Sequence, residues 1–248
     1  MKAELTVDEY MAGVGVDMFH AGGMRRTDEL AQMCGISGGS IVLDVGCGYG
    51  RTACHLAEKY ESNVTGIDIS ETMIEGARKK ARRERVEAMV RFEVGNGEST
   101  HFKDECFDVV ISEGTTVLID KERAMREYVR VVKHGGHIGL NELSWMKKPS
   151  NEIIERAFNE LQGVRPIEFD EWTKLFVDSG LKGVQSKTYK YKSTSWDIIE
   201  SLGLRALIKV GIGYVTNSEM RMWISRQETL FRECSDYWGY GLYVGRKP

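Results

Sequence analysis

The chain has 248 residues, 42% of them hydrophobic, which is enough to bury a core and favours a packed globule over a disordered chain. Its 34 basic and 37 acidic residues give a net charge of −3, so no overall attraction to nucleic acid is expected. Five scattered cysteines form no CxxC pair, which argues against a disulfide framework and a structural zinc site. With no run near the roughly 20 apolar residues of a membrane span and no secretory segment, we expect a soluble cytoplasmic protein.

The first predicted elements lie between residues 40 and 145, where short β-branched runs alternate with amphipathic stretches. This alternation is typical of βαβ units and a parallel sheet. Ser70 is well placed to cap the second helix. Five strands are predicted at 41–46, 63–70, 90–95, 106–114 and 135–143, and three helices at 51–60, 70–88 and 121–133.

The later elements have a different character. Helices are predicted at 149–163 and 169–181, a strand at 183–192, a mostly helical block at 196–237 and a last strand at 239–248. The pattern therefore predicts an α/β fold with a doubly wound, mostly parallel, seven-stranded sheet. The last two strands are joined by a long insertion, which is either an oligomer contact or a lid over a site.

The stretch IVLDVGCGYGRT, residues 41–52, combines a strand with a glycine loop. In an open α/β sheet, ligands bind beyond the carboxyl ends of the strands, normally at this first loop. Gly46, Gly48 and Gly50 permit positive φ and leave no Cβ against a ligand. A dinucleotide fingerprint needs a third glycine where Arg51 stands, and a P-loop needs a lysine before Ser or Thr, so both phosphate-binding interpretations lose support. A tight turn without any ligand would use the same glycines.

Asp68 ends the second predicted strand, about twenty residues beyond the glycines. A carboxylate at this place can accept hydrogen bonds from both hydroxyls of a ribose. A loop without phosphate chemistry, followed by a ribose acid, indicates an adenosine ligand that lacks a pyrophosphate.

The motifs DVGCGYG, GIDIS, GNGE, FDVVISE and VVKHGG, in this order, resemble those of the class I methyltransferases that use S-adenosylmethionine. The resemblance covers residues 41–142. It implies a Rossmann-like fold with an antiparallel last strand and helical insertions forming a lid. It also implies S-adenosylmethionine as the cofactor, S-adenosylhomocysteine as its product, and no metal.

The resemblance implies particular cofactor contacts. Asp44 and the glycine loop would lie against the methionine part, Asp68 would bind the ribose, and Ile69 would pack on the adenine. The third motif usually carries an Asp near the adenine amino group; Asn96 stands there, and its carbonyl can still accept from that group. The expected set is Asp44, Gly46, Cys47, Gly48, Asp68, Ile69, Asn96, Gly97, Glu98 and Ser112.

Three residues are candidates for general acid–base catalysis. Methyl transfer from a sulfonium is an in-line displacement, so a base is needed only where the acceptor must lose a proton. Glu113 and Glu142 follow the fourth and fifth strands, and each could act as a base, position an acceptor amine or merely fix a loop. His20 lies in a segment that resembles the N-terminal flap of many small-molecule methyltransferases. It is the third candidate, with an ordinary loop histidine as the alternative.

Several aromatic residues indicate what kind of molecule accepts the methyl group. Tyr10 near the start, and Trp196, Tyr214 and Trp223 in the late block, are candidate substrate contacts. If they line a pocket, the acceptor is small and lipid-like or aromatic, such as a quinone precursor. General similarity to quinone and sterol methyltransferases agrees with this. Packing against the sheet, or against the partner of a homodimer, would explain the same residues.

Two other functions stay open at this point. A nicotinamide-dependent oxidoreductase uses a similar fold, although Arg51 disfavours it, and a non-catalytic cofactor-binding protein would keep the same loop and acid. In either case we expect one domain over residues 1–248. Its predicted parts are a flap at 1–30, a cofactor-binding core at 31–145, helices and a sixth strand at 146–192, the insertion at 193–237 and the last strand at 238–248.

Overall fold

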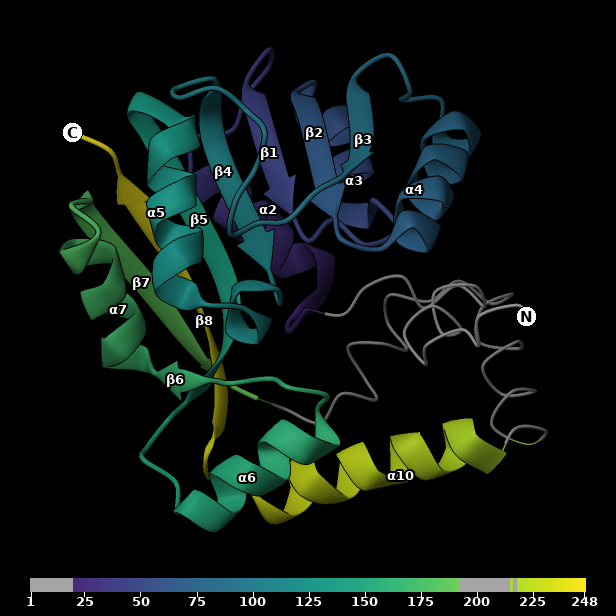
Figure 1. Ribbon diagram of the computed structural model, residues 1–248, viewed down its shortest axis with the longest axis vertical. Coiled ribbons are helices and arrows are strands. Elements are labelled where there is room, and N and C mark those ends of the chain that lie inside the picture. The colour runs from purple at the N-terminus through teal and green to yellow at the C-terminus, as the bar shows by residue number, and fades with distance from the viewer. Residues whose placement is uncertain (1–19, 192–214, 216–217) are drawn as a thin grey trace.

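The computed structural model describes residues 20–191, 215 and 218–248. Its centre is an eight-stranded sheet with helices on both faces (Figure 1). The strands are β1 (Ile41–Val45), β2 (Asn63–Asp68), β3 (Val90–Val94), β4 (Phe107–Glu113), β5 (Val132–Trp145), β6 (Ile167–Glu168), β7 (Lys182–Lys190) and β8 (Trp238–Arg246).

The sheet is mostly parallel. Its order is β3-β2-β1-β4-β5-β8-β7, and β6 pairs with the end of β5. Strands β1 to β5 pair in parallel, whereas β8 runs antiparallel to both β5 and β7. The predicted doubly wound α/β fold, with its antiparallel last strand, is therefore confirmed. The sequence does not predict β6, because two residues carry no periodicity.

Helices cover the two faces of the sheet unequally. One buried cluster joins the sheet to α2, α3 and α4, and a second joins its other face to α5 and α7. Alternate residues of one strand serve the two clusters: Val42 belongs to the first, and Leu43 to the second. The helices are α2 (Gly23–Met33), α3 (Arg51–Tyr60), α4 (Glu71–Glu84), the 3-10 turn η1 (Thr116–Leu118), α5 (Lys121–Val131), α6 (Asn151–Glu160), α7 (Phe169–Asp178) and α10 (Ser218–Glu233).

Helix α4 begins where the sequence predicts and ends earlier. The Ser70 hydroxyl accepts a hydrogen bond from the Met73 amide at 3.3 Å, which confirms the predicted N-cap. The helix stops at Glu84, because Arg85 takes a left-handed conformation with a φ of 61° and its amide closes the last turn. The four residues predicted beyond this point lie outside the helix.

Helices α6 and α10 lie side by side, apart from the layers that flank the sheet (Figure 1). Arg156 on α6 joins them, since it donates to both Glu160 on α6 and Glu233 on α10 at 2.7 Å. Of the late helical block, the structure describes chiefly α10, so the interpretation of the insertion as a lid or contact stays a prediction. None of the described helices is long and apolar enough to cross a lipid bilayer.

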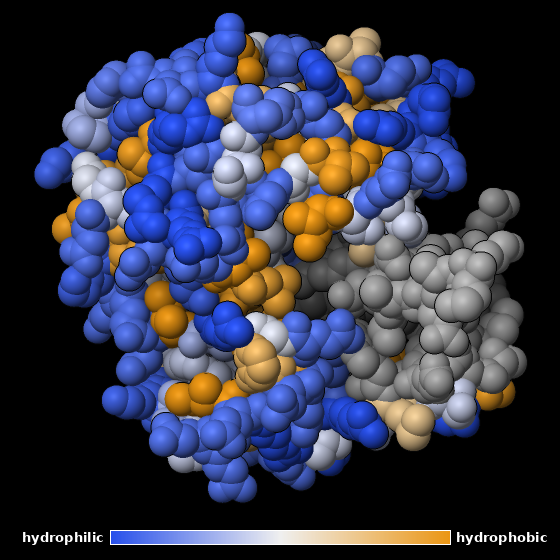
Figure 2. Space-filling model, in the orientation of Figure 1, coloured by the Kyte–Doolittle hydropathy of each residue, from blue (hydrophilic) through white to orange (hydrophobic). Residues whose placement is uncertain are grey.

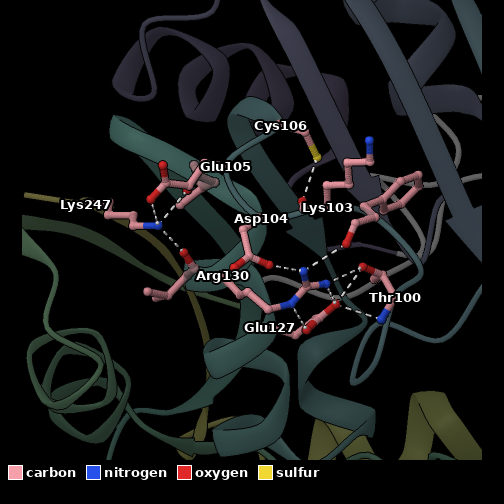
Figure 3. A network of polar contacts seen from close by, with 11 residues as sticks. Thr100, Lys103, Asp104, Glu105, Cys106, Glu127, Arg130 and Lys247 are labelled. Atoms are coloured by element: carbon pink, nitrogen blue, oxygen red, sulfur yellow. Dashed lines mark hydrogen bonds and ion pairs between the residues drawn. The ribbon is translucent and has the colours of Figure 1, made fainter.

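A polar network fixes the amino-terminal side of β4 (Figure 3). Arg130 on α5 donates to Glu127, to Asp104 and to the carbonyl of Phe102, all within 2.9 Å. Hydrogen bonds from Arg130, with others from Thr100, lower the pKa of Glu127 to about 2. The network binds the loop before β4 to α5.

Glu142 lies on the α5 side of β5 and is fully buried. Its carboxylate accepts hydrogen bonds from the amides of Thr116 at 2.8 Å and Val117 at 3.2 Å, and so holds η1. Burial raises its pKa to about 8. Asn141, the preceding residue, points to the other face, together with Glu113, its partner in the β4–β5 register. This placement separates Glu142 from Glu113 and favours the alternative that Glu142 fixes a loop.

The raised pKa of Glu142 predicts a pH-dependent stability. The unfolded chain binds this proton less tightly than the folded protein, so the stabilisation is complete below about pH 4.5 and is lost as the pH rises toward about 8. Each pH unit in this window removes up to about 1.4 kcal/mol from the free energy of unfolding. Urea unfolding of the wild type and of Glu142→Gln between pH 4 and 9 measures the difference. Parallel profiles for the two proteins would contradict the prediction.

Candidate functional site

Four polar side chains lie on one face of the sheet, at the carboxyl ends of neighbouring strands. Asp44 on β1 pairs with Gly66 on one side and Ile111 on the other. Because side chains alternate, Asp68 and Glu113, each two residues further on, share the face of Asp44. Asn141 on β5 stands directly opposite Glu113. The structure thus collects the polar ends of four strands beneath α2 and α3.

The glycine loop closes over the end of β1. The amides of Gly46 and Cys47 both donate to the carbonyl of Ile67, at 2.8 and 2.9 Å. A Cβ on Gly46 would overlap the side chain of Thr115, so this glycine lets the loop pack against the chain after β4. Gly48 also has a positive φ, of 50°, but a Cβ there would meet nothing within 4 Å. The space beside Gly48 is therefore an open cradle along the backbone.

Asp68 is tied to this cradle. Its carboxylate accepts from the amides of Gly48 at 3.0 Å and Ser70 at 2.9 Å, while burial raises its pKa. Next to it, Ile69 is 78% exposed, and Val94 at the end of β3 is also exposed. Figure 2 shows hydrophobic residues beside a recess near the middle of this view. A carboxylate beside uncovered aliphatic side chains fits a ribose and its attached flat base.

The third motif forms a compact turn. The side-chain oxygen of Asn96 accepts from the amide of Glu98 at 2.9 Å, and Glu98 accepts from the amide of Asp120 at 3.0 Å. A Cβ on Gly97 would lie 2.6 Å from Val45. All three residues therefore hold the loop after β3 against the sheet and the start of α5. Contact of Asn96 with an adenine stays a prediction and would use its second lone pair.

Two buried acceptors on the shared face lack partners. Asp44 Oδ2 and Asn141 Oδ1 have no hydrogen-bond partner among the residues that the structure describes. Burial, followed by the charges of Glu113 and Asp68, raises the pKa of Asp44 well above its usual range. Unsatisfied buried acceptors are rare, because each costs about 1–3 kcal/mol. The two unpaired oxygens, Asp44 Oδ2 and Asn141 Oδ1, could accept hydrogen bonds from a ligand that carries N–H donors or a positive charge.

Glu113 accepts hydrogen bonds from several elements of the fold. Its carboxylate accepts from Thr27 on α2 at 3.0 and 3.2 Å, from Thr52 on α3 at 2.9 Å and from Asn141 on β5 at 3.1 Å. Its side chain is only 3% exposed. Three different elements therefore donate hydrogen bonds to this one carboxylate.

His20 lies directly against Glu113. Its Nδ1 is 3.6 Å from Glu113 Oε1, and its side chain is 6% exposed. The ring also lies 3.2 Å from Asn141 Nδ2 and 3.5 Å from Thr27 Oγ1. Two of the three acid–base candidates, far apart in the sequence, are thus brought together, while Glu142 is on the other face. Ser112 also lies on that other face, buried and hydrogen-bonded to Thr116 at 2.9 Å.

The candidate substrate residues are not placed. Tyr10, Trp196 and Tyr214 lie outside the described residues, and of Trp223 the structure describes the position on α10 but not the side chain. Sequence reasoning missed Thr27, Thr52 and Asn141, which bind Glu113. Only the strand register could have found one of them, because Asn141 is at the same depth of the sheet as Glu113. In the described part of the chain, no three His, Cys, Asp or Glu side chains are grouped to hold a metal.

Comparison with known proteins gives a consistent result. A family model described as a methyltransferase domain matches residues 43–140. The 27-O-demethylrifamycin SV methyltransferase of Amycolatopsis mediterranei is 28% identical over 229 residues, which cover 90% of this chain and 83% of that protein. Phosphoethanolamine N-methyltransferase 1 of Arabidopsis thaliana is 34% identical over 172 residues, 68% of this chain. This chain spans only 34% of that relative's length.

A solved structure agrees in fold. The methyltransferase of Geobacter sulfurreducens in complex with S-adenosylhomocysteine superposes with a TM-score of 0.77 over 99% of both chains, at 18% identity. The oxidoreductase alternative is not favoured. The chain is a class I methyltransferase that uses S-adenosylmethionine as its cofactor.

Proposed function

We propose that the protein methylates a small acceptor and that His20, paired with Glu113, takes the proton that this acceptor loses. The single observation that carries the proposal is the position of this pair, on the same face and at the same end of the sheet as the glycine cradle. When bound, the cofactor supplies a methyl group on a sulfonium, ready for in-line transfer. The remaining chemistry belongs to side chains of this protein.

The cofactor side of the site is assigned from the loop. Gly46, Cys47 and Gly48 would line the methionine part, with Asp44 near its ammonium. Asp68 would accept from the ribose hydroxyls, and Ile69 would cover one face of the adenine. Asn96, Gly97, Glu98 and Ser112 would act mainly by holding the loops around it. The unpaired Asp44 Oδ2, the hydrogen bond between Gly48 and Asp68, and the exposure of Ile69 support this assignment.

The proposed role of His20 as a base is supported by its burial and by the neighbouring carboxylate of Glu113. A buried carboxylate 3.6 Å from an imidazole stabilises the positive charge that the ring gains with a proton. A base of this kind is useful for an acceptor with an ionisable hydroxyl or enol. The hydrophobic residues beside the recess in Figure 2 are consistent with an apolar or aromatic acceptor. Tyr10, Trp196, Tyr214 and Trp223 remain its predicted contacts.

Further expectations belong to the same proposal. One methyltransferase domain would extend over the whole chain, and a homodimer would form through residues 193–237. The five cysteines are all free thiols in the structure, which supports a reducing, cytoplasmic location. The small negative net charge is consistent with a small molecule, rather than a nucleic acid, as the acceptor.

Cofactor binding tests the cradle. In Gly48→Ala the new Cβ would occupy the open space beside the loop, so we expect the affinity for S-adenosylhomocysteine in titration calorimetry to fall about tenfold or more, equal to about 1.4 kcal/mol. Gly39→Ala is the matched control, because Gly39 also has a positive φ and open space but lies before β1. Both changes should cost about 1 kcal/mol of stability. Equal affinity in the two variants would contradict the cradle.

Turnover tests the base. We expect His20→Gln to lower methyl transfer to a phenol or quinol acceptor by roughly 100-fold, the usual share of a positioned base, while the affinity for S-adenosylhomocysteine stays within a few-fold. Transfer of a labelled methyl group to a panel of phenols, quinols, amines and thiols provides the measurement. His55→Gln is the control, since His55 is also paired with a carboxylate, Asp28, but lies on α3 outside the site. Equal turnover by wild type and His20→Gln would refute the base.

A further inference from the structure

Two positively charged side chains, Lys121 and Arg165, belong to segments that meet at η1, the turn after β4. Lys121 is the first residue of α5, which follows η1 closely in the chain. Arg165 lies in the loop between α6 and β6, and its backbone amide donates to the carbonyl of Val117 in η1 at 2.9 Å. Two segments that are far apart in the sequence thus bring a lysine and an arginine to the same turn at the carboxyl edge of the sheet.

Neither of these cations is held by an acidic side chain in the described part of the chain. Each lies over an aromatic ring instead. Lys121 Nζ is 5.8 Å from the centre of the Trp172 ring, and Arg165 Cζ is 4.9 Å from the centre of the Phe158 ring. An aromatic face attracts a cation and fixes its position, but it does not neutralise the charge. Lys121 is half-buried and Arg165 is exposed, so a ligand can approach them from solvent.

The two positive charges act on each other. Burial lowers the pKa of Lys121, Glu142 raises it, and the charge of Arg165 lowers it again. Near neutral pH, Glu142 supplies little negative charge, because its own pKa is about 8. The carboxylate of Asp120 accepts from the backbone amide of Arg123 at 2.9 Å and caps α5. Like charges near one another in a partly buried place are unfavourable, and an anion bound between them would remove this cost.

The turn η1 connects these cations to the glycine loop. Thr115, directly before η1, packs so closely on Gly46 that a Cβ there would overlap its side chain. Leu118, the last residue of η1, is 43% exposed. Along this stretch the chain therefore presents the contact with the glycine loop, an uncovered leucine and then positive charge. A molecule that lies across η1 would meet an apolar contact and the two cations together.

We propose that Lys121 and Arg165 form an anion subsite for a carboxylate or phosphate group of the methyl acceptor, whose apolar part lies on Leu118. The inference rests on the proposed function, methyl transfer to a small acceptor, and names the chemical class of that acceptor. A guanidinium binds such a group through two parallel N–H donors, and an ammonium adds a further N–H donor and a point charge. The acceptor is then an organic acid or a phosphate ester with an apolar part, rather than an uncharged lipid.

Binding of small probes tests the subsite without turnover. Phenyl phosphate, benzoate and phenol are titrated into the whole protein saturated with S-adenosylhomocysteine, and ¹H–¹⁵N NMR shifts give the dissociation constants. We expect at least one of the two anions to bind the wild type about tenfold more tightly than phenol and to shift the amide signals of η1. Arg165→Gln and Lys121→Gln should each weaken binding of that anion about tenfold and leave phenol binding unchanged.

Arg126→Gln is the matched control, because Arg126 is also on α5 but is already paired with Glu122 and 66% exposed. It removes the same charge and should leave every dissociation constant unchanged. Tighter binding of the phosphate or of the carboxylate supports the subsite, and the difference between them identifies the anion. Equal binding of the three probes, or an equal loss in Arg126→Gln, overturns the subsite. If the anion binds at η1 but no acceptor is methylated, the subsite stands and the proposed function fails.

Discussion

The site depends on one buried carboxylate, Glu113, which receives its hydrogen bonds from three different elements. Thr27 brings α2, Thr52 brings the first turn of α3, and Asn141 brings β5. A buried carboxyl group is costly unless its oxygens are hydrogen-bonded, and leaving one such group without its partner costs about 1–3 kcal/mol. None of the three elements can therefore move far without leaving an oxygen of Glu113 unsatisfied. The glycine loop leads into α3 and His20 precedes α2, so the position of the proposed base relative to the loop depends on this one carboxylate.

The polar residues at the ends of β4 and β5 lie on two different faces of the sheet. Glu113 and Asn141 share the α2 face with Asp44, whereas Ser112 and Glu142 point to the α5 face. On the α5 face both side chains bond to Thr116, and so hold η1, the turn that follows β4 at the same edge. Side chains on the α5 face thus hold the loop, whereas the α2 face carries the residues that we propose to act in the reaction. The alternation of side chains along β4 and β5 separates these tasks within two residues.

Much of the fold was accessible from the sequence, and part of the site was not. The seven main strands have clear alternation or apolar runs, and the glycine loop has a spacing that only a few ligands use, so both are predictable locally. The short β6 has no such signal. Glu113 and Glu142 have the same chemistry at the ends of adjacent strands, and the register, offset by one residue, determines which of them faces the site. The contacts of Thr27 and Thr52 with Glu113 depend on where two helices pack, which no local pattern records.

Hydrogen–deuterium exchange of Glu113→Leu tests the central role of this carboxylate most directly. Leucine has a similar volume but no accepting oxygen, so Thr27, Thr52 and Asn141 all lose their partner. The account predicts faster exchange of the amides in α2 and in the first turn of α3, with α4 and α7 unchanged. Unchanged exchange in α2 and α3, or a uniform increase over the whole chain, would contradict it.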